Sequence, residues 1–231
     1  MRSRALVTLV LCTMLVTFSF FPAMAGEKKT YVTFKAGVYG PTGDLDDADY
    51  DTGLNGEVAF GHYIIPNLAF EAGIGHFSTE AEYPISYSDP TLVLRGEKKD
   101  EVTCIPLTIT LKAVLPADRF ELYLGGGFGL YFAELEGNVS ATAVVDGVPH
   151  GITASFEDSD TPIGVHIIGG FTVDIYKSFF MGVEGKHIWT QEGKAQGAAR
   201  LGVDEISGLI PLKIESNLNG YTVTGLIGFR F

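Results

Sequence analysis

The residues with the clearest chemical potential are His76 and Ser78, which stand two positions apart, with Glu80 two positions further on. A histidine and a serine can act as base and nucleophile if they come within hydrogen-bond reach and if an acid such as Glu80 orients the imidazole. A histidine followed two residues later by a serine is also common by chance. We therefore interpret the pair as a histidine at a strand end beside a loop serine, and we predict no catalytic residue.

A second group is acidic and lies between residues 44 and 51; it consists of Asp44, Asp46, Asp47, Asp49 and Asp51. Hard cations such as calcium prefer carboxylate oxygens as ligands. The glycine and the terminal glutamate of a calcium-binding loop are misplaced here, so the spacing does not match such a loop. The sequence predicts a solvated acidic loop, with no metal site and no cofactor.

The elements that position these residues are strands, because eight segments alternate apolar residues with small or polar ones. Each segment has about the length, roughly 9–11 residues, that a tilted strand needs to cross a bilayer. The connections alternate between long loops and tight turns, as they do in outer-membrane barrels. The pattern predicts an all-β fold, an eight-stranded antiparallel up-and-down transmembrane β-barrel. The segments are 31–39, 54–64, 68–77, 102–115, 120–132, 163–175, 179–189 and 221–231, and the long loops are 40–53, 78–100, 133–160 and 190–218.

The last segment carries its apolar stripe to the final residue, through Tyr221, Val223, Ile227, Phe229 and Phe231. An edge strand of a secreted β-sandwich can also alternate, but it rarely ends the polypeptide on an aromatic residue. We interpret this stripe as an assembly signal. Further aromatic residues near strand ends are predicted to form girdles at the two membrane surfaces; they are Phe120, Phe132, Phe179 and Trp189.

The first 25 residues have the three parts of a secretory signal peptide: Arg2 and Arg4, an apolar stretch, and a small-x-small cleavage site. The expected mature domain is therefore 26–231. Loss of the two arginines would change the formal net charge from −12 to −14, which makes nucleic acid a poor partner. Only Cys104 would remain, so the mature chain can form no intramolecular disulfide.

The polar faces of the segments carry four acids and four bases. An eight-stranded barrel is so narrow that side chains fill it, and buried charges are costly unless they are paired. The equal numbers predict a closed salt-bridge network in the lumen rather than a pore. Asp174 and His166 are left over and are expected near opposite mouths, in contact with water. The network residues are Lys35, Glu57, Glu71, Lys112, Glu121, Glu184, Lys186 and Arg230.

Four stretches carry a resemblance to a known family: GEVAFGHY at 56–63, PNLAFEAG at 66–73, YLGGG at 123–127 and GFRF at 228–231. The chain resembles the small eight-stranded outer-membrane barrels, such as the amino-terminal domain of outer-membrane protein A, outer-membrane protein X and the opacity-type adhesins. The resemblance implies a terminal phenylalanine read by the barrel-assembly machinery, and roles that range from adhesins and membrane–wall tethers to small-solute channels and lipid-modifying enzymes. Relatives that deacylate lipid A carry their His and Ser on late strands, unlike His76 and Ser78.

The function predicted is structural or surface-interacting: a monomeric, non-enzymatic barrel with a plugged lumen in the outer membrane of a Gram-negative bacterium. The expected partners are outer-membrane lipid, lipopolysaccharide and, during biogenesis, the barrel-assembly machinery. Three alternatives stay open, namely a narrow small-solute channel, a lipid A-modifying enzyme and a soluble periplasmic β-sandwich.

Overall fold

The computed structural model describes residues 29–88, 92–145, 148–203 and 206–231. The expected signal peptide, residues 1–25, lies outside the described residues and stays a prediction. The elements in chain order are β1 (Thr30–Pro41), α2 (Asp44–Asp47), β2 (Gly53–Ile65), β3 (Leu68–Ser88), β4 (Leu92–Ala117), β5 (Phe120–Val145), β6 (Val148–Asp160), β7 (Ile163–Tyr176), β8 (Phe179–Thr190), β9 (Gly193–Val203), β10 (Ile206–Ser216) and β11 (Gly220–Arg230).

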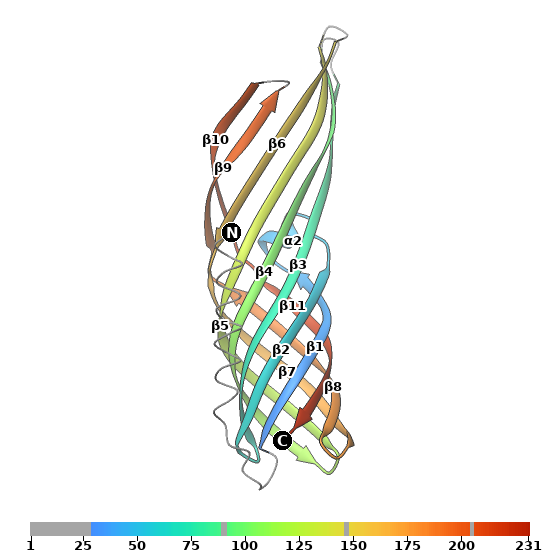
Figure 1. Cartoon of the computed structure of the whole chain (residues 1–231), viewed down its shortest axis with the longest axis vertical. Helices are drawn as coiled ribbons and strands as arrows, with labels where there is room; N and C mark the ends of the chain where they lie inside the picture. Colours follow the sequence, from blue (N-terminus) through green and yellow to red (C-terminus); the bar gives the residue numbers. More distant parts are fainter. Residues whose placement is uncertain (1–28, 89–91, 146–147, 204–205) are drawn as a thin grey trace.

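Eight of these strands close into a ring (Figure 1). They follow one another as antiparallel neighbours in the order β1, β2, β3, β4, β5, β7, β8 and β11, and β11 returns to pair with β1. Phe34 stands opposite Ile227 across the closing pair and opposite Val58 on its other side, so apolar residues line up along the outer face. The predicted up-and-down barrel is confirmed, and the β-sandwich alternative is wrong because one closed ring replaces two stacked sheets.

Three of the four predicted long loops are strands instead. The upper halves of β3, β4 and β5 continue past the ring, β6 pairs with the upper half of β5, β9 pairs with β6, and β10 pairs with β9. Figure 1 shows these six strands rising from the barrel as a tall sheet, which we call the extension. Polar composition favours loops in these segments, but their polar residues alternate with apolar ones. Residues 140–145, which lie within the predicted loop 133–160, are all strand and belong to β5.

Prolines occupy places where a backbone N–H is not needed. Glu80 accepts a hydrogen bond from the Asp51 N–H on the side of β3 away from β4. Backbone groups alternate in direction along a strand, so the nitrogen of Pro84, four residues after Glu80, points to the same open side. No neighbouring strand of the described sheet needs a hydrogen-bond donor there. Pro106 of β4 sits where the paired register with β3 is interrupted, between Leu107 and Cys104. The open edge of β3 in the extension is thus interrupted by a proline, which hinders the addition of a further strand there.

The outer surface of the ring is a band of exposed apolar side chains, a surface that water disfavours. The side chains of Leu124, Phe128 and Ile167 are between 55% and 71% exposed, and similar residues surround the ring. Among the described residues, no helix is both long and apolar enough to cross a membrane.

Aromatic side chains lie at both ends of this band. Phe179 and Phe229 contact each other with ring centroids 5.1 Å apart, beside the tight turns, and Trp189 packs on His187 at 4.3 Å near the opposite end. Phe120 projects outward at the start of β5, and Phe132 lies midway along that strand, where the ring gives way to the extension. Their role as membrane girdles stays a prediction.

Candidate functional site in the barrel interior

The interior of the barrel is the candidate functional site because the polar faces of all eight ring strands meet there. Successive side chains of a strand point to opposite faces, so a closed ring turns one face of each strand inward. The eight charged residues predicted for the lumen all lie on this inner face. Seven are at most 9% exposed, and Glu121, near the end of the barrel that holds the tight turns, has a side chain 20% exposed.

Lys35 of β1 stands at the centre of the interior. Its Nζ lies 2.7 Å from Glu57 Oε1, 2.9 Å from Glu71 Oε1 and 2.8 Å from Glu184 Oε1. These carboxylates come from β2, β3 and β8, so one ammonium group links strands on both sides of β1. Charge-assisted hydrogen bonds of this kind are the stronger ones in proteins.

Two further lysines complete this group. Lys112 Nζ lies 2.5 Å from Glu71 Oε2 and 3.3 Å from Glu184 Oε2, and Lys186 pairs with Glu57. Three lysines therefore face three glutamates, and their formal charges cancel. We call these six residues the central network.

Tyrosine hydroxyls donate further hydrogen bonds to the central network. The Tyr31 hydroxyl donates to Glu71 Oε2 at 3.0 Å, and the Tyr123 hydroxyl donates to Glu184 Oε2 at 2.9 Å. Lys112 Nζ also lies 4.5 Å from the centroid of the Tyr123 ring, within the range of a cation–π contact. Neither tyrosine was assigned a role from the sequence. Their even spacing from Lys35 and Glu121 on the same strands was the available signal.

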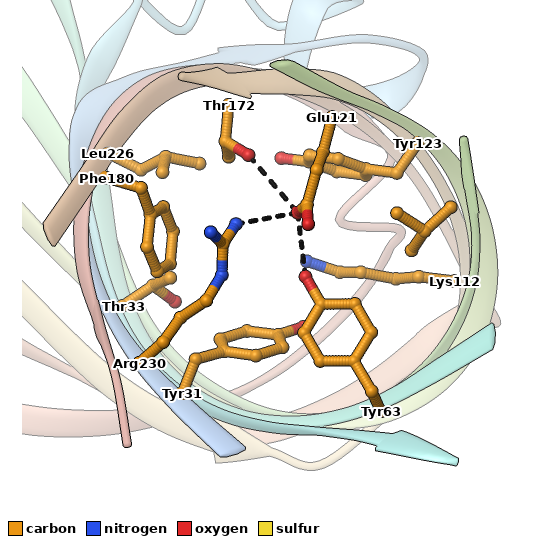
Figure 2. A pocket seen from close by; sticks show the side chains of 11 residues that line it. Tyr31, Thr33, Tyr63, Lys112, Glu121, Tyr123, Thr172, Phe180, Leu226 and Arg230 are labelled. Atoms are coloured by element: carbon orange, nitrogen blue, oxygen red, sulfur yellow. Dashed lines mark hydrogen bonds and ion pairs between the residues drawn. The ribbon is translucent and has the colours of Figure 1, made fainter. Parts of the chain in front are cut away.

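A second charged group closes the end of the barrel near the tight turns. Arg230 Nη2 lies 2.7 Å from Glu121 Oε2, and its Nη1 donates to Asp174. The Tyr63 hydroxyl donates to the same Glu121 oxygen at 2.7 Å (Figure 2). Asp174 was expected near a mouth in contact with water, and its side chain, 37% exposed, does lie at this end of the barrel. It also shares Arg230 with Glu121. The four predicted acids and four predicted bases thus divide into three against three in the central network and Glu121 against Arg230 at this end, where Asp174 adds a fifth acid.

His166 departs from expectation. It was placed near a mouth with water around it, but it is only 2% exposed, and its Nε2 lies 2.8 Å from Thr110 Oγ1. The cause is the pairing of β7 with residues 120–130 of β5, which sets His166 opposite Gly127. A Cβ at Gly127 would lie 1.9 Å from the Ile109 carbonyl oxygen and 2.8 Å from His166 Nε2, so the glycine leaves room for the neighbouring strand and for the imidazole.

Apolar layers lie on both sides of the central network. Toward the tight turns the layer contains Tyr31, Tyr123, Phe180 and Leu226, and toward the extension a second layer is built on Tyr39, Phe77, Val102, Cys104, Tyr131, Ile188 and Leu218. Tyr39 and Phe77 stack there with ring centroids 4.1 Å apart. Charged and apolar layers therefore follow one another along the lumen.

The first loop caps the second apolar layer. Leu45 of α2 is 4% exposed and packs into that layer, whereas the five aspartates of the loop are partly or fully solvated as expected. Asp44 accepts hydrogen bonds from the Asn217 backbone N–H at 3.0 Å and from its Nδ2 at 2.6 Å. Burial, and then the charge of Asp100, raises the pKa of the Tyr50 hydroxyl in this loop. The buried leucine within the acidic run was missed, although it was the one apolar residue between the first aspartates.

A small cavity remains in the described interior, beside Arg230 and Tyr63 (Figure 2). Its volume is about 20 Å³, which is room for about one water molecule. No group of three or more His, Cys, Asp or Glu side chains among the described residues is arranged to hold a metal ion.

His76, Ser78 and Glu80 lie on the outer face of β3, one above another. Glu80, which could orient the base of a catalytic pair, instead pairs with Lys99 at 2.5 Å. The described hydrogen bonds include none between His76 and Ser78.

The predicted assembly-signal residues project outward from β11. Tyr221, Val223, Ile227, Phe229 and Phe231 are between 40% and 59% exposed. The Phe231 N–H donates to the Thr30 carbonyl at 2.9 Å, so the final residue joins the closing pair of strands. Recognition by an assembly machinery stays a prediction.

A closed ring of eight antiparallel strands, apolar outside and filled with paired charges inside, defines a transmembrane β-barrel. The sequence comparison agrees with this class of protein. Residues 9–231 match the family described as outer membrane protein beta-barrel domain, and the chain belongs to that family.

Other comparisons give remote likenesses. Neisserial surface protein A is 12% identical with a TM-score of 0.48, and the alignment covers 87% of this chain and 97% of that one. A major outer membrane protein from Thermus thermophilus is also 12% identical with a TM-score of 0.48, covering 88% and 98%. Ail, the attachment invasion locus protein of Yersinia pestis, is 12% identical with a TM-score of 0.32, covering 88% and 97%. No curated protein matches the sequence.

Proposed function

We propose that this chain is a monomeric barrel of the Gram-negative outer membrane, exported through a cleaved signal peptide, with a closed lumen and a structural or surface-interaction role. The observation that supports a closed lumen best is the central network between its two apolar layers. Six buried charged side chains, joined strand to strand, occupy the narrow interior of an eight-stranded ring. An ion that crosses would have to separate these buried pairs, which costs several kcal/mol.

The extension supports the surface role. Its strands stand beyond the apolar band, on the side of the barrel opposite the chain terminus Phe231 (Figure 1). The proposed partners are outer-membrane lipid and lipopolysaccharide around the band and the barrel-assembly machinery during biogenesis. Because Glu80 is engaged by Lys99, a catalytic role for His76 and Ser78 has no support in the contacts. We propose that the protein is not an enzyme.

Planar-bilayer recording on the purified mature chain tests the closed lumen. We expect no steady openings from the wild-type barrel. A narrow channel would instead give steady openings that disappear in Glu184→Ala or Lys186→Ala, and that result would overturn the proposal. Fractionation of the host cell, together with heat-modifiable gel mobility, tests the location: recovery of a folded, detergent-free protein from the periplasm would contradict it.

A further inference from the structure

The small cavity in the barrel interior lies where the two charged groups of the lumen meet (Figure 2). Its wall contains Arg230 and Glu121, which with Asp174 form the charged group near the tight turns, here called the turn-end group. The same wall contains Lys112 of the central network and Tyr31, which donates a hydrogen bond to that network. Both charged groups therefore border one small space.

Arg230 brings an unused hydrogen-bond donor to this wall. Its Nη2 lies 2.7 Å from Glu121 Oε2, and its Nη1 donates to Asp174. The third nitrogen, Nε, is buried and has no hydrogen-bond partner among the described residues. Arg230 is only 9% exposed, and its Cζ lies 4.4 Å from the centroid of the Phe180 ring, so bulk solvent does not serve Nε. A buried donor without a partner is costly and rare, so this one indicates an acceptor in the cavity.

The size and the charges of the cavity select that acceptor. A volume of about 20 Å³ holds about one water molecule. A cation is disfavoured, because the unused donor belongs to a positive group and Lys112 stands in the same wall. Chloride is larger than water and would meet the Glu121 carboxylate, and an apolar molecule would leave Nε without an acceptor. Water accepts from Nε and can also donate to oxygen atoms of the wall, such as those of Glu121 and Thr172.

We propose that the cavity is a binding site for one ordered water molecule, which accepts a hydrogen bond from Arg230 Nε and donates to oxygen atoms of the wall. A buried water of this kind satisfies polar groups that the protein itself leaves without partners. Because residues of both charged groups form the wall, the water molecule links the turn-end group to the central network.

The water molecule reaches this site from the end of the barrel that holds the tight turns. The side chains of Asp174 and Glu121 at that end are 37% and 20% exposed, respectively. On the other side of the cavity stands the central network, in which Lys35, Glu57 and Glu184 are at most 8% exposed. The lumen is thus hydrated at one end and dry beyond it, so the site does not require a continuous path for water.

The test uses the full mature chain in lipid nanodiscs with ¹⁵N-labelled arginine. The Nε–H resonance of Arg230 is assigned by its absence in Arg230→Lys, and its NOE and ROE cross-peaks to water are recorded by NMR. A long-lived bound water molecule gives NOE and ROE cross-peaks of opposite sign, whereas mobile water gives cross-peaks of the same sign. We expect opposite signs at Arg230 Nε–H.

Two variants fill the cavity from different strands. Val114→Ile adds one methylene group, which is about the size of a water molecule, and Leu226→Met replaces a branched side chain of the wall by a longer one. The water cross-peak of Arg230 should disappear in Val114→Ile and weaken or disappear in Leu226→Met. The matched control is Val102→Ile, which adds the same methylene group to the apolar layer toward the extension and should keep the cross-peak.

Three results would overturn the inference. The first is a wild-type spectrum without a dipolar cross-peak between water and Arg230 Nε–H, and this spectrum decides the matter even if Val114→Ile does not fold. The second is a pair of NOE and ROE cross-peaks of the same sign, as a lumen filled with mobile water would give. The third is a cross-peak that persists in both Val114→Ile and Leu226→Met, because these variants keep every hydroxyl of the wall and such a peak would be relayed through one of them.

Discussion

The central network makes a quantitative prediction about Glu184, whose carboxylate is 1% exposed and contacts Lys35 and Lys112. The substitution Glu184→Gln keeps the size of the side chain and removes its charge. The central network then holds three lysines against two glutamates, with little water to screen the excess. Removing one partner of a buried ion pair costs about 3–5 kcal/mol, so we expect a loss of this size in the free energy of unfolding.

Two companion variants isolate the electrostatic cause. Glu80→Gln breaks the ion pair between Glu80 and Lys99, whose side chains are 49% and 44% exposed, respectively. An exposed ion pair contributes about 1 kcal/mol or less, so this variant should lose little stability. The double variant Glu184→Gln with Lys112→Met removes one charge of each sign. It should be at least about 1 kcal/mol more stable than the sum of the two single losses predicts, because contacting residues couple.

The assay is urea unfolding of the barrel in lipid vesicles, followed through Trp189, the single tryptophan of the chain. Its indole projects toward the outer surface and is 41% exposed, so its emission changes when the strands leave the bilayer. If Glu184→Gln lost no more stability than Glu80→Gln, or if the double variant were simply additive, the lumen charges would not form the coupled network described above.

Other parts of the structure give three more predictions. Burial, and then the charges of neighbouring glutamates, raises the pKa of the Glu134 carboxyl in the extension. An acid whose pKa is raised by folding destabilises the folded state above its unfolded-state pKa of about 4.3, and this cost disappears as the pH falls through the folded-state pKa. Hydrogen-exchange protection factors of β5 and β6 should therefore rise from neutral to mildly acidic pH, and Glu134→Gln should flatten the trend. Gly127→Val should cost about 1–3 kcal/mol in urea unfolding, because its side chain would crowd the Ile109 carbonyl of the neighbouring strand and the His166 ring. Gly126→Ala, where a Cβ would lie 3.5 Å from the nearest atom, should be tolerated; equal losses would contradict the packing argument. Deletion of Phe231 should reduce assembly into the outer membrane in cells but not refolding into detergent, and a parallel loss of both would remove its role as a signal.

Much of the interior could be predicted because alternation along a strand is local. Once Lys35 and Glu57 were assigned to the polar faces of their strands, closure of the ring had to turn both inward. Whether they would meet was not local, since it depends on the height of each residue in the barrel. Lys35 and Glu57 stand directly opposite each other in the register of β1 and β2, and the structure brings their charged groups to 2.7 Å.

The extension shows where the same reasoning fell short. Polar residues in the segment 133–160 led to the expectation of a loop, although Val139, Ala141 and Ala143 alternate with them. A strand that leaves the bilayer meets water on one face and another part of the protein on the other, so its pattern of polarity changes while its period stays two. The period identifies the strand, and the composition only reports its surroundings.

Consecutive residues are enough to specify the eight ring strands, the inner and outer faces of each and the need to pair the buried charges, because a period of two is a local property of the chain. The folded arrangement was needed to show that Asp174 shares Arg230 with Glu121, that His166 is buried against Thr110 and that Leu45 caps the lumen. Each of these contacts joins residues far apart in the chain, and the stagger between neighbouring strands sets their heights in the barrel. That stagger follows from backbone pairing around the whole ring, which no single segment encodes.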